Sequence, residues 1–244
     1  MITTLLLLLL AGQHPDMQKG LEAADSCFAN VDYETAISMY DSLLQLSPQN
    51  PDILWRFSRV YISIGDVMPR EEREPVYRKA EDYARECIRA DSTRSEGHSW
   101  LAASLGNLAM VVSDEEKVKL TTEIKNELER AIALNPEDDV AYSILGSFYR
   151  ALGNIGWFER MLANIFLGSI PPGGYEESEV AIKKAIQIAP DVLRHQFELV
   201  LLYRDWGKTE EERTALERAS QLPILVASDI PTQERIKEML AEED

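Results

Sequence analysis

The sequence has few of the residues that form disulfide bonds or bind metal ions in a small protein. Among 244 residues there are 2 cysteines and 3 histidines. Cys27 and Cys87 form no Cys-x-x-Cys pair, and no His-x-x-x-His spacing occurs. This pattern argues against a disulfide framework, a zinc site and metal-dependent catalysis. We therefore predict no metal and no cofactor, and we expect both cysteines to pack as small apolar side chains.

Basic residues are scarce as well. Lys and Arg number 25 and Asp and Glu number 42, so the formal net charge is −17. A chain of this charge repels the phosphate backbone of nucleic acids and anionic lipid headgroups. Nucleic acid is therefore not an expected partner. The hydrophobic fraction of 45% and the charged fraction of 27% are typical of a globular chain and argue against disorder.

Long apolar runs are also missing, apart from a short one at the amino end. Leu5 to Leu10 are consecutive leucines followed by Ala11-Gly12. The run is too short for a transmembrane span, which takes about 20 apolar residues. It is similar to the apolar part of a secretory signal, although no Lys or Arg follows Met1. We predict a leader at residues 1–13 and an exported or periplasmic protein; an apolar first helix in a cytoplasmic protein is the alternative.

Recognisable catalytic motifs are absent. No Gly-x-Ser-x-Gly occurs, and Gly173-Gly174 lacks the rest of a phosphate-binding loop, so a turn is expected there. The chain is therefore predicted not to be an enzyme.

An internal repeat is the dominant feature that is present. Tyr142-x2-Leu145-Gly146-x2-Tyr149 matches the first half of a two-helix repeat of about 34 residues, and Ala36 with Tyr40 opens a matching second half. Related halves recur along the chain. The pattern resembles the tetratricopeptide repeat over about residues 17 to 225. The resemblance implies an all-α, right-handed solenoid of about five helix pairs.

Prolines mark the ends of the predicted pairs, because proline cannot continue a helix and restricts the residue before it. The boundaries fall at Ser47-Pro48, Asn135-Pro136 and Ala189-Pro190. The predicted repeat domain covers residues 14–228. Residues 229–244 are predicted to form a capping helix, with Ile236, Met239 and Leu240 over the last pair, and an acidic tail.

The spacing between half-repeats is uneven. About ten extra residues lengthen the second and third pairs, and about twenty extend the fourth. In the fourth pair, residues 155–167 carry an apolar stripe that predicts an inserted helix, closed by Pro171-Pro172-Gly173-Gly174. Whether this helix fills the groove of the solenoid or lines it is left open.

A narrower resemblance lies in the carboxyl half. Asn135-Pro136-Glu137-Asp138, Leu145-Gly146, Trp157-Phe158, Pro171-Pro172 and Tyr175-Glu176 are similar to the regulator of microtubule dynamics family. That resemblance implies an all-helical repeat protein, associated with microtubules, in which no catalytic residues are expected.

The concave face of such a solenoid holds extended peptides, and its side chains come from the first helix of each pair. At those positions four arginines occur on one face of a very acidic protein. An acidic or carboxylate-bearing segment, held by bidentate arginine contacts and two aromatic anchors, is the predicted ligand. The alternative is that the arginines pair with neighbouring Glu and Asp. The candidate peptide-binding residues are Trp55, Arg59, Arg150, Arg194, Phe197 and Arg204.

Acidic clusters, among them Glu137 to Asp139, precede predicted helices, where negative charge complements the helix dipole. Binding of calcium or of a basic partner is the alternative, although no cluster has the spacing of a calcium loop. Taken together, the sequence predicts a non-enzymatic scaffold for protein–protein interaction, with a microtubule-associated regulatory protein as the alternative.

Overall fold

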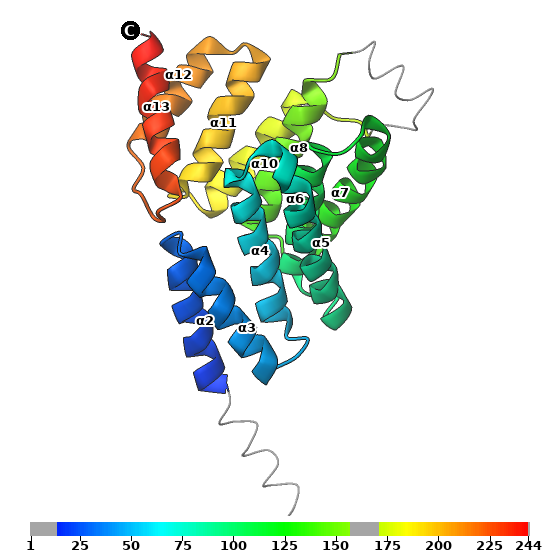
Figure 1. The fold of residues 1–244 in the computed structure, drawn as a ribbon. Helices are drawn as coiled ribbons and strands as arrows, with labels where there is room; N and C mark the ends of the chain where they lie inside the picture. Colours follow the sequence, from blue (N-terminus) through cyan, green and yellow to red (C-terminus); the bar gives the residue numbers. More distant parts are fainter. Residues whose placement is uncertain (1–13, 157–170, 244) are drawn as a thin grey trace, which may run out of the picture.

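A computed structural model describes residues 14–156 and 171–243, and within them every regular element is helical (Figure 1). The helices are α2 (His14–Ala29), α3 (Tyr33–Leu46), α4 (Pro51–Val67), η1 (Arg70–Glu72), α5 (Arg73–Ala90), α6 (Ser95–Ala109), α7 (Asp114–Leu134), α8 (Asp139–Gly153), α10 (Tyr175–Ile188), α11 (Leu193–Trp206), α12 (Thr209–Ser220) and α13 (Asp229–Glu243). The predicted leader, residues 1–13, and nearly all of the predicted inserted helix at 155–167 lie outside the described residues. No helix among the described residues is long and apolar enough to cross a bilayer.

The helices form consecutive pairs, which confirms the predicted all-α solenoid of five pairs. Each pair packs against the next, so that the core is continuous along the chain. The pairs are α2 with α3, α4 with α5, α6 with α7, α8 with α10, and α11 with α12.

Local sequence signals set the ends of these helices. The Asp138 carboxylate accepts the backbone N–H of Ala141 at 2.9 Å and so caps α8, and Asp32 caps α3 in the same way. α3, α7 and α10 each end two residues before a proline, as the boundary argument predicts. Gly207, with φ of 73°, ends α11 in the left-handed conformation that glycine adopts at little cost.

Small residues allow the two helices of a pair to approach closely. A Cβ at Gly146 would lie 2.3 Å from Cγ1 of Ile182, so the α8–α10 crossing requires glycine. The Ser178 hydroxyl donates to the Gly146 carbonyl at 2.7 Å in the same buried seam. Ala36 of α3 and Ala102 of α6 are also small residues of the repeat core, and both are fully buried.

The chain curves so that the first helices of the pairs form its inner layer. α4 contacts α6, α6 contacts α8, and α8 contacts α11. Among the described residues, the second helices make no comparably extensive contacts with one another. Because the first helices lie closer together, the concave side of the arc is the side that they line.

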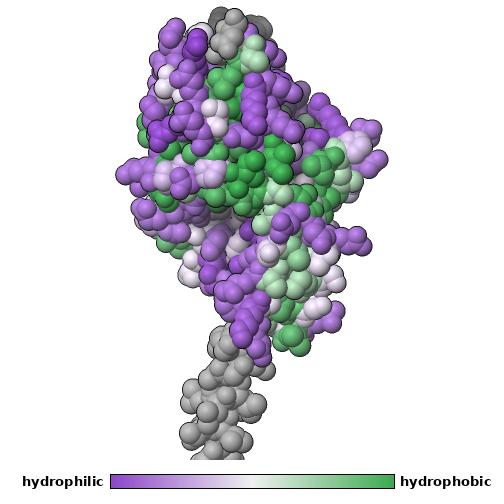
Figure 2. All heavy atoms as spheres, turned by 90° about the vertical axis from the view of Figure 1, so that its left-hand side faces the viewer, coloured by the Kyte–Doolittle hydropathy of each residue, from purple (hydrophilic) through white to green (hydrophobic). Residues whose placement is uncertain are grey.

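The two ends of the arc meet. The backbone N–H of Ala227 donates to the carbonyl of Ala29 at 2.8 Å, which joins the segment before α13 to the end of α2 (Figure 1). Figure 2 looks at this side of the molecule and shows apolar residues gathered across its middle. Exposed apolar side chains next to this junction in the sequence are Val31 after α2, Ile224 and Leu225 before α13, and Ile230 in the first turn of α13.

Helix α13 caps the last pair. Ile236 and Met239 are buried against α11 and α12, and Leu240 packs beside them. The Gln233 side-chain amide donates to the carbonyl of Ser220 at 3.1 Å, at the end of α12. These contacts cover the apolar face that a terminal repeat would otherwise leave in water.

Candidate binding site on the inner face

A hollow of about 250 Å³ opens on the concave side between α4, α6 and the start of α8. It lies where three consecutive first helices meet, so its walls come from the second, third and fourth pairs. We call it the inner hollow. Its lining residues are Trp55, Arg59, Glu96, Ser99, Trp100, Asn135, Glu137, Asp138, Asp139 and Val140.

Two tryptophans form the apolar wall of the inner hollow. The rings of Trp55 and Trp100 are nearly parallel, at 8°, with their centroids 6.4 Å apart. The guanidinium of Arg56 lies 4.2 Å from the Trp55 ring centroid, and that of Arg59 lies 5.0 Å away. The Trp55 ring therefore already packs against positively charged groups, which the electron-rich face of an indole attracts.

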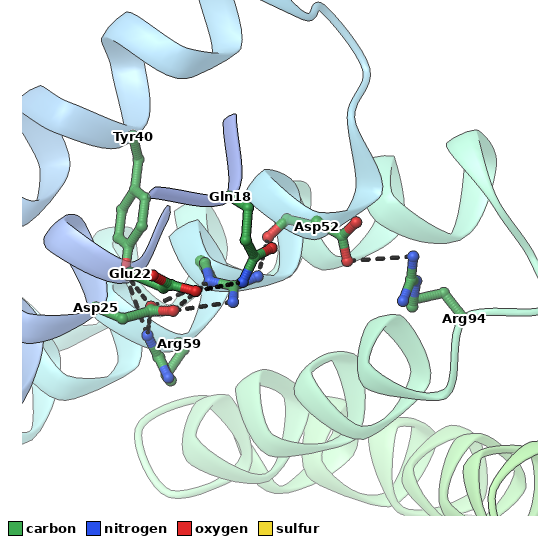
Figure 3. Close-up of polar contacts among 8 residues, drawn as sticks. Gln18, Glu22, Asp25, Tyr40, Asp52, Arg59 and Arg94 are labelled. Carbon is green, nitrogen blue, oxygen red and sulfur yellow. Dashed lines mark hydrogen bonds and ion pairs between the residues drawn. The ribbon is translucent and has the colours of Figure 1, made fainter. Parts of the chain in front are cut away.

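Beside this wall the first two pairs share a cluster of charged residues (Figure 3). The Asp25 carboxylate of α2 accepts Nε of Arg56 at 2.9 Å and Nη2 of Arg59 at 2.5 Å. The Tyr40 hydroxyl of α3 donates to the same carboxylate at 2.6 Å. Burial would raise the pKa of Asp25, but the hydrogen bonds from Arg56 and Tyr40 and the two positive charges outweigh it, and this pKa is lowered. Asp25 is therefore ionised, and the two arginines share its single negative charge.

A further ion pair ties the second pair to the third. Nη2 of Arg94, which precedes α6, lies 3.1 Å from the Asp52 carboxylate at the start of α4 (Figure 3). This contact and the Asp25 cluster hold three consecutive pairs in register along the inner face.

Three of the four carboxylates that line the inner hollow have side-chain partners on other helices. Asp138 accepts the Ser99 hydroxyl at 2.8 Å in addition to capping α8. Asp139 accepts Nε2 of His195 at 2.8 Å, a hydrogen bond that lowers the pKa of Asp139. Glu137 lies 3.4 Å from Nζ of Lys184.

Glu96 differs from the other carboxylates of the hollow. Its one hydrogen bond within the described chain is a long one, 3.4 Å, from the hydroxyl of the adjacent Ser95, and no described cation pairs with it. It lies on α6, four residues before Trp100, and therefore on the same face of that helix.

The structure separates the six predicted peptide-binding residues into groups. Trp55 and Arg59 line the inner hollow. Arg150 of α8 pairs with Asp205 at 2.8 Å and with Glu198, both of α11, and Arg204 pairs with Glu212 of α12 at 2.7 Å.

The remaining two predicted residues belong to the fifth pair: Arg194 is exposed, and Phe197 packs against the apolar core there. Three of the four predicted arginines are thus ion-paired with Asp or Glu, which is the alternative that the sequence left open. Whether these six residues contact a ligand stays a prediction.

The inner hollow also includes residues that sequence reasoning missed. Trp100 and Glu96 were not singled out, although both lie in the first helix of the third pair, on the face toward the groove. The one available signal was an aromatic residue directly before the repeat residues Leu101 and Ala102. The presence of Trp100 in the sequence does not show which other aromatic ring it packs against.

Other chemistry is not apparent in the described part of the chain. No group of three His, Cys, Asp or Glu side chains within residues 14–156 and 171–243 is arranged to hold a metal ion. Cys27 and Cys87 are free thiols, and burial raises the pKa of Cys87 to about 12, so this thiol is inert at neutral pH.

Stacked helix pairs, an inner layer of first helices and a terminal cap define a tetratricopeptide-repeat protein. A solved tetratricopeptide-repeat protein of Thermus thermophilus shares the fold with a TM-score of 0.69, at 18% identity over 93% of this chain and 97% of its own.

The family is narrower than the fold. The model of regulator of microtubule dynamics protein 1–3 matches residues 20–243, and the chain belongs to that family. Regulator of microtubule dynamics protein 1 of Bos taurus is 23% identical over 92% of this chain and 71% of its own length. Protein 3 of Xenopus laevis is 25% identical over 78% of this chain and 41% of its own length.

Proposed function

We propose that this protein is a non-enzymatic scaffold that binds a segment of a partner protein along its concave face. The observation that carries the proposal is the inner hollow, because it lies where helical-repeat proteins bind extended segments and has two indole rings in its wall. Buried aromatic side chains are the usual anchors of protein interfaces.

Two side-chain N–H groups of residues that line the inner hollow lack a hydrogen-bond acceptor in the described chain. Nε1 of Trp55 and Nε of Arg59 are both buried and have no hydrogen-bond partner within residues 14–156 and 171–243. Burying an unpaired N–H costs about 1–3 kcal/mol. Both side chains line the inner hollow, so a bound segment that shifts either of them would bring main-chain carbonyl acceptors to these donors.

A displayed library of random 12-residue peptides tests the proposal. We expect selected peptides to protect backbone amides of α4 and α6 from hydrogen exchange, and to bind the Trp100→Ala variant at least about tenfold more weakly, the loss typical of one interface anchor. Lys119→Ala is the matched control, since Lys119 is exposed on the second helix α7. Peptides that bind both variants like the wild type, with protection confined to second helices, would contradict the proposal.

Regulation of microtubules is the second candidate function. It is supported by membership of a family whose model and relatives are named for that activity. The net charge of −17 opposes contact with any acidic partner surface, so binding to polymerised tubulin would have to use basic patches on the partner or apolar contacts.

Co-sedimentation with polymerised tubulin at low and at high salt tests this candidate. Binding that weakens as salt rises indicates charge contacts, and binding that does not change indicates apolar ones. A chain that stays in the supernatant at both salt concentrations would remove direct microtubule binding as a function.

A further inference from the structure

We infer that the inner hollow receives a lysine or arginine side chain of the bound segment. This inference rests on the proposed scaffold function and specifies what one position of the ligand must be. It reverses the charge expected from the sequence, where arginines on the concave face predicted an acidic segment.

The charge balance of the hollow favours a cation. Four carboxylates line it against a single guanidinium, that of Arg59. Arg59 shares the single negative charge of Asp25 with Arg56, so these two guanidinium groups leave one positive charge against the four carboxylates. The local charge is therefore negative, and the surrounding protein adds to this potential with its net −17.

Glu96 supplies the specific partner. Two of the other carboxylates already pair with cationic or ionisable side chains, and Asp138 is used by a hydroxyl and a helix cap. Glu96 is half-buried at the hollow and has no described cation within ion-pair distance. An ammonium or guanidinium group placed there would form a charge-assisted hydrogen bond with it.

The aromatic wall suits the same ligand. The guanidinium groups of Arg56 and Arg59 already lie against the Trp55 ring, so this wall offers a ligand apolar surface for its stem and leaves its charge to Glu96. The methylene stem of a lysine or arginine packs against apolar surface while its charged end stays at the polar rim. Indole rings beside a free carboxylate therefore match both parts of such a side chain.

The arginines from which an acidic ligand was predicted are less free to bind a ligand carboxylate than the sequence suggested. Arg59, Arg150 and Arg204 each have at least one carboxylate partner on another helix. A carboxylate-bearing ligand would have to displace those partners, whereas a basic side chain at Glu96 displaces none.

A small probe that mimics the end of an arginine side chain tests the inference. The wild-type protein is titrated with n-butylguanidinium, n-butanol and butyrate at low salt, and the indole N–H signals are followed by nitrogen-15 NMR. We expect n-butylguanidinium alone to shift the signals of Trp55 and Trp100. Trp206 is an internal control, because it stacks on Tyr175 and has Lys208 over its ring. Equal shifts from butanol or larger shifts from butyrate would overturn the inference.

The Glu96→Gln variant identifies the partner. We expect it to weaken n-butylguanidinium binding by about tenfold, the loss of one hydrogen bond to a charged group, while Glu115→Gln on the exposed start of α7 leaves it unchanged. A thermal melt checks that the variant folds. The Glu96→Asp variant repeats the test with a carboxylate on a side chain that is one methylene shorter. Unchanged affinity in a folded Glu96→Gln variant would overturn the assignment.

The library selection separates this inference from the proposed function. Peptides that protect α4 and α6 and lose affinity when a lysine is replaced by norleucine support both. Peptides that protect α4 and α6 but carry Asp, Glu or only apolar residues support the scaffold and overturn the basic side chain. Selected peptides that never protect the concave face overturn the scaffold itself, whatever the small probe does.

Discussion

Gly146 of α8 and Ile182 of α10 lie so close that a Cβ at position 146 would stand 2.3 Å from Cγ1 of Ile182. The α8–α10 pair also contributes, through the start of α8, one wall of the inner hollow. The spacing of these two helices therefore bears both on stability and on the shape of the site.

Gly146→Ala is expected to destabilise the protein by about 1–3 kcal/mol, because the added methyl group overpacks the seam. Gly106→Ala is the matched change, since no atom lies within 4 Å of a Cβ there and Gly106 is inside helix α6. That variant should gain up to about 1 kcal/mol from helix propensity. Urea denaturation of both measures the difference, and a Gly146→Ala variant as stable as Gly106→Ala would contradict the predicted overpacking.

Asp25→Asn is expected to cost about 1–3 kcal/mol, the range for losing hydrogen bonds to charged groups, because it leaves Arg56 and Arg59 without their shared carboxylate. Removal of the exposed Glu115–Lys119 pair by Glu115→Gln should leave stability nearly unchanged, because water screens this pair. Chemical denaturation at pH 7 compares the two. The prediction fails if both variants lose the same small amount.

The ion pair between His98 and Glu127 predicts a pH dependence of stability. Burial disfavours a charged His98, but the Glu127 carboxylate, 2.6 Å from Nδ1, and the Ser92 carbonyl outweigh it, so the pKa of His98 is raised above 6.5. A raised folded-state pKa stabilises the fold fully below the unfolded pKa, and this contribution is lost as pH rises through the folded pKa.

We therefore expect the free energy of unfolding of the wild type to contain a component that decreases with pH above about 6.5, and the Glu127→Gln variant to lack it. Denaturation curves at several pH values from 5.5 to about 8.5 measure this. Parallel pH profiles for the two proteins would show that the pair has no such effect.

Val31, in the turn between α2 and α3, has a φ of 64° and an exposed side chain. A β-branched residue is strained in this left-handed region, where asparagine is well tolerated. Val31→Asn should therefore raise stability by about 1 kcal/mol, at the low end of the cost of such strain. Thermal melting checks the gain, and a lower melting temperature would mean that the Val31 side chain contributes more by packing than the backbone loses.

The sequence predicted the architecture well because its signals are local or separated by one repeat. Prolines such as Pro136 end helices wherever they occur. Small residues such as Ala36 and Gly146 recur with the repeat, at positions where two helices pack closely. Ile236, Met239 and Leu240 lie on one face of a helix, and such a face caps the solenoid when it packs on the neighbouring last pair. Fold class, pair boundaries and the capping helix therefore follow from residue order.

The candidate site followed from the sequence only in part. Trp55 and Arg59 were identified because they occupy inward positions of a first helix, but with 42 acidic residues in the chain the sequence could not say which carboxylate meets which arginine. Asp25 lies 34 positions before Arg59, and the superhelix alone brings them within 2.5 Å.

By itself, the amino-acid order determined that this chain is a stack of helix pairs, acidic overall, with aromatic and basic residues on its inner layer. Only the tertiary structure decided that Arg59 is ion-paired with Asp25, that Trp100 stands parallel to Trp55, that no described cation lies within ion-pair distance of Glu96, and that Ala227 returns to Ala29. The reason is physical: helix periodicity acts over a few residues, whereas the partners of a charged side chain depend on how successive pairs are rotated around the axis of the solenoid.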